Sequence, residues 1–139
     1  MSQQRADDPA VLDGVPFFED FPAEERRRVL ELSSPTEVAA GAIVIDQGDT
    51  ALDCFLIVDG VASVYVRGEF VTTVGAGSMV GEMALIDHRP RSASVVAETP
   101  MRLLAFRTKD FRKLLDEMPR ASERILAELQ ARLDRNREQ

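Results

Sequence analysis

Two apolar, β-rich runs joined by an Asp-Gly pair occupy residues 54–66, which read CFLIVDGVASVYV. The runs Cys54–Val58 and Val61–Val66 are rich in β-branched and aromatic residues, which favour strands. Asp59-Gly60 between them is typical of a type I′ turn, because that turn needs positive φ at both central residues. This stretch therefore predicts a β-hairpin.

Further short strands are predicted on both sides of this stretch, each bounded by glycine or aspartate. They are Thr36–Ala39, Ala42–Ile45, Phe70–Val74, Ser94–Ala97 and Arg102–Phe106. Short strands at near-regular spacing are typical of an all-β sandwich or barrel. Gly48 and Gly77 are predicted to hold turns, because glycine adopts positive φ at little cost. We therefore expect a mainly β fold of seven or eight strands over residues 35–107.

Helical patterns flank the predicted strands. Pro22 suits the first position of a short amphipathic helix that ends near Leu32. The run Arg26 to Arg28 is expected on its solvated face, with a partner contact as the other interpretation.

After residue 107 the apolar period becomes helical, and two C-terminal helices are predicted over residues 108–136. Thr108 is the predicted N-cap of the first, and Pro119 its predicted end. Their apolar stripes consist of Phe111, Leu114, Leu115 and Met118, then of Ile125, Leu126, Leu129 and Leu133.

Length and composition restrict the class of protein. A chain of 139 residues corresponds to one domain, which we place at residues 11–139 after a disordered tail at 1–10. The net charge of −7 disfavours nonspecific nucleic-acid binding. No apolar run approaches a membrane span, no secretory signal is evident, and the single cysteine, Cys54, cannot form an internal disulfide. A cytoplasmic protein with Cys54 as a small buried hydrophobe is expected.

Residues 81–95, GEMALIDHRPRSASV, break the rhythm of the strands. A helical turn after Gly81 would present free backbone N–H groups, which bind anions. Arg91 can match a phosphate in charge and in geometry, and Glu82 can accept hydrogen bonds from a sugar hydroxyl. Taken alone, such a Glu and Arg are usually a weak surface pair. Together, these features favour a clamp for a phosphate and a ribose.

The same segment resembles the phosphate-binding cassette of the cyclic nucleotide-binding domain family, to which catabolite activator protein and protein kinase A regulatory subunits belong. The matching residues are Gly81-Glu82-Met83-Ala84-Leu85 and Pro90-Arg91-Ser92-Ala93-Ser94-Val95, with upstream matches from Gly41 to Gly77. The resemblance covers roughly residues 12–135. It implies an eight-stranded β-roll, jelly-roll-like, with an N-terminal helical segment and two C-terminal helices. Val80 departs from the family's usual phenylalanine, which predicts looser packing under the cassette.

The resemblance also implies a role for each ligand-binding residue. Glu82, beside Gly81, would hold the ribose 2′-hydroxyl, and Arg91 would pair with the cyclic phosphate. Backbone N–H groups near Ala84 and Ser92 would share that phosphate.

The base pocket would be lined by Met83, Val64 and Val71, although simple core packing is the other interpretation of these three. The last helix would close over the base, with Ile125, Leu126 or Leu129 as the cap. That helix could instead pack permanently on the roll or form a dimer seam. Ser92 favours cAMP over cGMP, because a threonine often stands there in cGMP-binding relatives.

Three functions are compatible with a predicted β-roll of this kind. The first is a regulatory module, not an enzyme, that binds a cyclic nucleotide without a cofactor and moves its C-terminal helices. The second is a structural or interaction domain with a relict, non-binding cassette. The third, a cupin-type metalloenzyme, needs two or three histidines, whereas this chain has only His88. Six residues follow Leu133, so we expect no DNA-reading domain on this chain, and either an unknown protein partner or an effector domain outside the chain.

Overall fold

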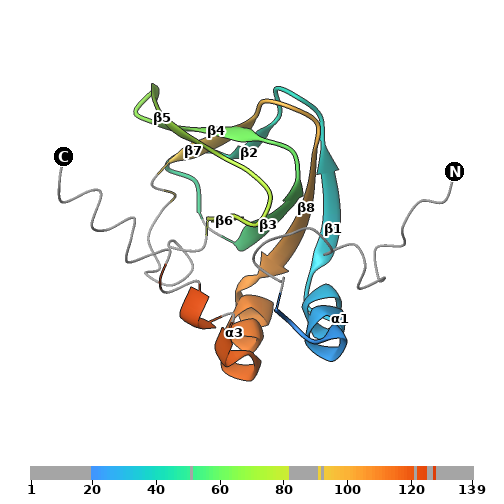
Figure 1. Ribbon diagram of the computed structural model, residues 1–139. Coiled ribbons are helices and arrows are strands. Elements are labelled where there is room, and N and C mark those ends of the chain that lie inside the picture. Colours follow the sequence, from blue (N-terminus) through green and yellow to red (C-terminus); the bar gives the residue numbers. More distant parts are fainter. Residues whose placement is uncertain are drawn as a thin grey trace, which may run out of the picture.

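The computed structural model describes residues 20–50, 52–81, 91, 93–120, 122–124 and 127. Its eight strands form two antiparallel sheets of four strands, with helices packed at one end (Figure 1). This arrangement confirms the predicted mainly β fold and the eight-stranded roll. Among the described residues, no helix is long and apolar enough to cross a membrane.

The first sheet has the order β1-β8-β3-β6. Its strands are β1 (Ser34–Val38), β8 (Met101–Arg107), β3 (Asp53–Asp59) and β6 (Met79–Val80). Strand β3 is buried on both faces, because Cys54 and Leu56 pack toward the helices while Ile57 packs inside the roll. A strand covered on both sides reads as a continuous apolar run rather than an alternating one.

The second sheet has the order β2-β7-β4-β5. Its strands are β2 (Ile43–Ile45), β7 (Ser94–Ala97), β4 (Ala62–Val66) and β5 (Glu69–Val74). Strands β3 and β4 therefore lie in different sheets, and the predicted hairpin at Asp59-Gly60 is wrong. The connection crosses between the sheets instead. Gly60 has φ +101° and lies close to Pro100. A Cβ built on Gly60 would stand 2.6 Å from the carbonyl oxygen of Pro100.

The type I′ hairpin lies eight residues later, at Arg67-Gly68. These residues have φ +54° and +80°, and they join β4 to β5 with Val66 paired to Glu69. Arg67 is the only described non-glycine residue with positive φ. Sequence reasoning missed this hairpin because arginine rarely adopts that conformation, whereas Asp-Gly commonly does.

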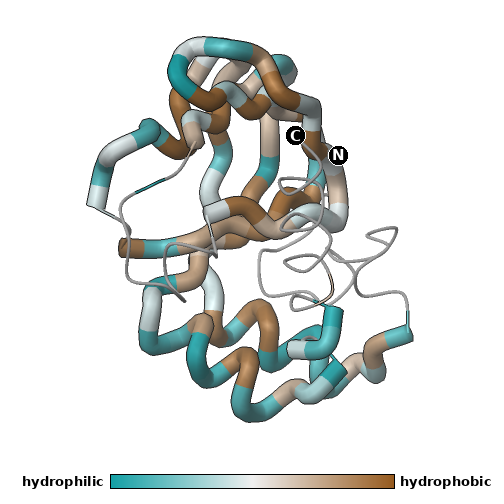
Figure 2. The backbone as a smooth tube through the Cα atoms, turned by 90° about the vertical axis from the view of Figure 1, so that its left-hand side faces the viewer, coloured by the Kyte–Doolittle hydropathy of each residue, from teal (hydrophilic) through white to brown (hydrophobic). Residues whose placement is uncertain are grey.

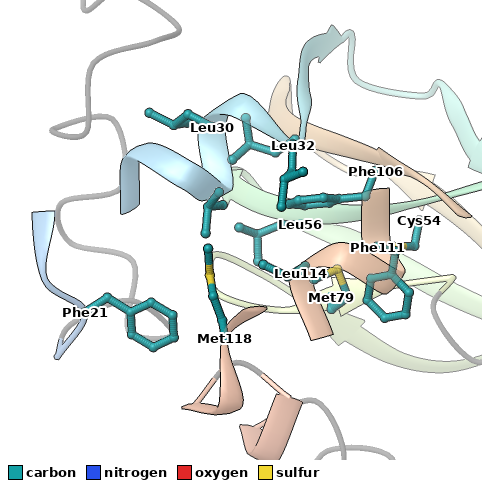
Figure 3. Packing of buried hydrophobic residues seen from close by; sticks show 12 residues of the cluster. Phe21, Leu30, Leu32, Cys54, Leu56, Met79, Phe106, Phe111, Leu114 and Met118 are labelled. Carbon is teal, nitrogen blue, oxygen red and sulfur yellow. The ribbon is translucent and has the colours of Figure 1, made fainter. Parts of the chain in front are cut away.

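The described residues form two hydrophobic clusters, one between the sheets and one between the first sheet and the helices. Figure 2 shows hydrophobic backbone segments in both the strands and the helices. The helical cluster includes Phe21, Cys54, Leu56, Phe106, Phe111, Leu114 and Met118, most of which converge in Figure 3. Cys54 is fully buried, as predicted, and Val80 is buried in the cluster inside the roll. Most of the cassette lies outside the described residues, so the looser packing predicted beneath it stays a prediction.

The helices begin one residue away from the predicted positions. Helix α1 (Ala23–Glu31) has Pro22 as its N-cap rather than its first residue, and the Pro22 carbonyl accepts the first helical hydrogen bond from Arg26. Helix α3 (Thr108–Glu117) has Arg107 at the N-cap. Thr108 is therefore its first residue, and the Thr108 hydroxyl lies 3.4 Å from the Leu52 carbonyl oxygen instead of capping the helix.

A bidentate ion pair joins the two helices, although they are far apart in sequence. Arg28 donates from Nε to Oε1 of Glu117 at 2.9 Å and from Nη2 to Oε2 at 3.0 Å. The third nitrogen donates to Glu31 at 3.1 Å. Arg28 is therefore engaged within the chain while its side chain stays 36% exposed, so this ion pair lies on the solvated face that was predicted for the arginine run. These hydrogen bonds hold the pKa of Glu117 below its usual value.

We predict that Glu117→Gln lowers the stability of the chain at pH 7 and has little effect at acid pH. Because the folded-state pKa of Glu117 is lowered, its contribution is present above the ordinary glutamate pKa of about 4.3 and is lost as pH falls through the lowered value. Urea denaturation at pH 7 and at acid pH measures the difference. Glu37→Gln, an exposed change on β1, is the control. An equal loss of stability at both pH values would contradict the role of the ion pair.

Candidate functional site

Arg91 is a cationic residue almost fully enclosed by the protein, with 7% of its surface exposed. Its Nη1 donates to the carbonyl oxygen of Gly81 at 2.9 Å. Its Nη2 donates to the carbonyl oxygen of Asp53 at 2.6 Å and lies 3.3 Å from the carboxylate of the same residue. A buried charge is costly unless it is hydrogen-bonded, and these partners hold the guanidinium in one orientation.

The backbone of Arg91 is held by a tight turn after β2. In that turn the Asp49 N–H donates to the Asp46 carbonyl, and Gly48 has φ +91° as predicted. The Gly48 N–H donates to the Arg91 carbonyl, and the Arg91 N–H donates to the Asp49 carbonyl, both at 2.9 Å. Both ends of Arg91, backbone and guanidinium, are therefore positioned by other parts of the chain.

Gly81 lies directly against the Arg91 guanidinium. Its φ is +83°, and a Cβ at this position would collide with Arg91 Nη1 and stand 2.9 Å from Ile45 Cδ1. Glycine is required here both by its backbone conformation and by the close approach of the cation. The carbonyl of Gly81 can reach Nη1 because no side chain intervenes.

The predicted lining residues Val64 and Val71 lie on β4 and β5. Val64 is partly buried and packs against the cluster inside the roll. Val71 is 51% exposed and is the extra residue at an irregularity between the pairs Val64↔Thr72 and Tyr65↔Phe70. Directly paired residues share a face of the sheet, so Thr72 lies on the same face as Val64. Thr72 was not among the predicted lining residues, although the alternation from Thr72 to Val74 would have indicated which face it lies on.

Several predicted site residues lie outside the described residues. They are Glu82, Met83, Ala84 and Ser92 of the cassette and Ile125, Leu126 and Leu129 of the last helix. Their assigned roles stay predictions. Asp53 was not predicted, since it lies 38 residues from Arg91 and only the pairing of β3 with β6 and β8 brings the two together.

The arrangement is suited to binding a small anion. The guanidinium is buried, and its direction is set by two main-chain carbonyls. The nearby Asp53 side chain is 39% exposed and offsets only part of the positive charge. Among the described residues, no group of three or more His, Cys, Asp or Glu side chains could hold a metal ion.

Comparisons with known proteins show what the chain is similar to. The sequence pattern of the family described as "Cyclic nucleotide-binding domain" matches residues 35–118, more than half of the chain. The chain is similar to the cAMP-dependent protein kinase regulatory subunit of Schizosaccharomyces pombe, with 35% identity over 107 residues. That match covers 76% of this chain and 26% of the relative, so the chain spans about a quarter of that protein.

Solved structures show the same fold. The catabolite activator protein of Thermus thermophilus is 28% identical with a TM-score of 0.77, and the match covers 87% of this chain and 59% of that one. A structure described as "Sp-2Cl-cAMPS bound to PKAR CBD2" is 24% identical with a TM-score of 0.74, covering 90% of this chain and 86% of that one.

We predict that Gly81→Ala destabilises the chain by about 1–3 kcal/mol, because it adds both a strained φ and a collision with Arg91. Gly41→Ala is the matched control, since Gly41 has φ +88° with nothing within 4 Å of a built Cβ. The Gly41→Ala variant measures the loss of stability that comes from the positive φ alone. Urea denaturation of both variants gives the comparison. If both lose the same stability, the close approach of Arg91 to Gly81 has no energetic consequence.

Proposed function

This chain belongs to the cyclic nucleotide-binding domain family, and on that premise we propose that it is a regulatory module that binds cAMP in preference to cGMP. The observation that supports this most directly is the buried Arg91, whose guanidinium is oriented by the carbonyls of Gly81 and Asp53. A cyclic phosphodiester carries one negative charge. It is therefore neutralised by a single arginine, and the module needs no metal and performs no chemistry.

The remaining contacts to the nucleotide are proposed from the resemblance of residues 81–95 to the phosphate-binding cassette. Glu82 holds the ribose 2′-hydroxyl, and backbone N–H groups near Ala84 and Ser92 share the phosphate with Arg91. Val64, Thr72 and Met83 face the base. The pairing of Val64 with Thr72 supports this part of the proposal, because it places an apolar and a hydroxyl side chain on one face.

Preference for cAMP is proposed from Ser92. A serine at this position makes a weaker contact to the guanine amino group than the threonine common in cGMP-binding relatives. The preference is therefore a difference in affinity between two ligands that share the ribose and the cyclic phosphate and differ in the base.

The signal is proposed to leave through the C-terminal helices. Helix α3 follows β8 directly, and its buried residues Phe111 and Leu114 pack in one cluster with Leu56 of β3. Strand β3 begins at Asp53, which holds Arg91. Ligand contact at Arg91 can therefore shift the population of helix positions, by at most the ligand's differential affinity for the two states. A cytoplasmic location, a protein partner or effector domain outside this chain, and a homodimer through the last helix belong to the same proposal.

We predict that cAMP raises the thermal unfolding temperature of the chain. A ligand at 100 times its dissociation constant adds roughly 2.7 kcal/mol of stability. Differential scanning fluorimetry with cAMP and cGMP measures this, with 5′-AMP as the control, because it has the same base and ribose without the cyclic phosphate. No shift at millimolar concentrations of either cyclic nucleotide would favour the alternative, a structural domain that does not bind. A preference for cGMP of tenfold or more would overturn the proposed selectivity.

We predict that Arg91→Lys weakens cAMP binding by tenfold or more, and that Arg91→Ala costs about 2–5 kcal/mol of binding. Lysine keeps the charge but loses the planar fork that can bond the two carbonyls and the phosphate together. Isothermal titration calorimetry gives the affinities. Arg102→Lys, a change on the exposed side of β8, is the matched control and should bind as the wild type does. Unchanged affinity in Arg91→Lys would mean that the anion is held elsewhere.

A further inference from the structure

The turn that holds the backbone of Arg91 also makes a side-chain contact with a distant hairpin. Gln47 is the second residue of that turn, one residue before Gly48, which bonds the Arg91 carbonyl. The Oε1 atom of Gln47 accepts a hydrogen bond of 2.8 Å from the backbone N–H of Arg67. Arg67 lies 20 residues away, in the two-residue connection between β4 and β5.

This contact satisfies a donor that the hairpin itself cannot satisfy. In a type I′ turn the N–H of the first central residue takes no part in the strand pairing, and a non-glycine residue with positive φ adds strain. Arg67, with φ +54°, has both properties. The Gln47 amide therefore stabilises the tip of the hairpin in the conformation that the structure shows.

The backbone of Gln47 is fixed on its other side. The Gln47 N–H donates to Ser94 Oγ at 2.9 Å, and that hydroxyl lies 3.2 Å from Oδ1 of Asp46. Ser94 begins β7, three residues after Arg91. The turn at residues 46–49 is thus hydrogen-bonded to Arg91 and to Ser94 of β7, and its Gln47 side chain reaches the hairpin.

We propose that Gln47 is a positioning residue that couples the β4–β5 hairpin to Arg91. The proposal rests on the proposed function, in which Arg91 holds the phosphate while Val64 and Thr72 of the hairpin face the base. Gln47 then fixes the spacing between the phosphate side and the base side of the site. A ligand that contacts both sides then binds to a site whose two sides are already at the correct distance. This preorganisation lowers the conformational cost of binding.

The test compares Gln47→Met with Gln47→Glu. Methionine has nearly the same length but no acceptor oxygen, whereas glutamate keeps an oxygen at the position of Oε1. We expect Gln47→Met to raise the dissociation constant for cAMP about threefold to tenfold, as for the loss of one hydrogen bond. We expect Gln47→Glu to recover most of the affinity. Gln47 is exposed, so both variants should fold, and thermal unfolding checks this.

The second measurement needs no ligand. Amide hydrogen exchange of Arg67, followed by NMR in the free chain, should be faster in Gln47→Met and restored to the wild-type rate in Gln47→Glu. Glu69→Gln, a change on the opposite side of the same turn, is the control and should leave the Arg67 exchange rate unchanged.

Two results would overturn the proposal. One is an unchanged Arg67 exchange rate in Gln47→Met. The other is wild-type cAMP affinity in a Gln47→Met variant whose Arg67 amide has lost its protection. Failure of the proposed function gives a different result: the wild-type chain would bind neither cyclic nucleotide, and the coupling would then have no ligand to act on.

Discussion

A buried arginine places the strongest constraint on this fold. Arg91 carries a full charge in a position where 7% of its surface is exposed, and such a group must be hydrogen-bonded in a defined geometry. Two main-chain carbonyls, from Gly81 and Asp53, meet that requirement. Main-chain partners are held by the strands around them, so the direction of the guanidinium is determined by the sheet rather than by mobile side chains.

The surrounding architecture can be understood as support for this residue. Strand β3 places Asp53 beside Nη2 of the guanidinium, and the pairing of β3 with β6 brings Gly81 to Nη1. The turn that ends at Asp49 holds the Arg91 backbone from the second sheet. The site therefore lies where the two sheets meet. On the opposite side of β3, Leu56 packs against the helices, which are tied together by Arg28 and Glu117. One strand thus connects the arginine to the helical end of the molecule.

The local patterns predicted much of the fold, and their failures share a cause. Ser94–Ala97 was predicted at its observed boundaries. In the predicted apolar stripe from Phe111 to Met118, Leu115 is partly buried and the other three residues are buried. The hairpin at Asp59-Gly60 was wrong, because a turn propensity does not reveal whether the chain returns in the same sheet or crosses to the other. The hairpin at Arg67-Gly68 was missed because its unfavourable φ is supported by Gln47, a residue 20 positions away.

The sequence by itself determined the chemistry of the chain. It indicated a β-rich domain with flanking helices, placed Arg91 in a glycine- and proline-framed motif, and held too few histidines for a three-histidine metal centre. These properties depend on residue type and short-range spacing, which are visible without coordinates. The tertiary structure decided which carbonyls receive the guanidinium, that Asp53 lies beside it, and that Thr72 rather than Val71 shares a face with Val64. Strand pairing sets these relations. A register depends on contacts between residues tens of positions apart, and a single added residue at a bulge moves the side chains that follow it to the other face.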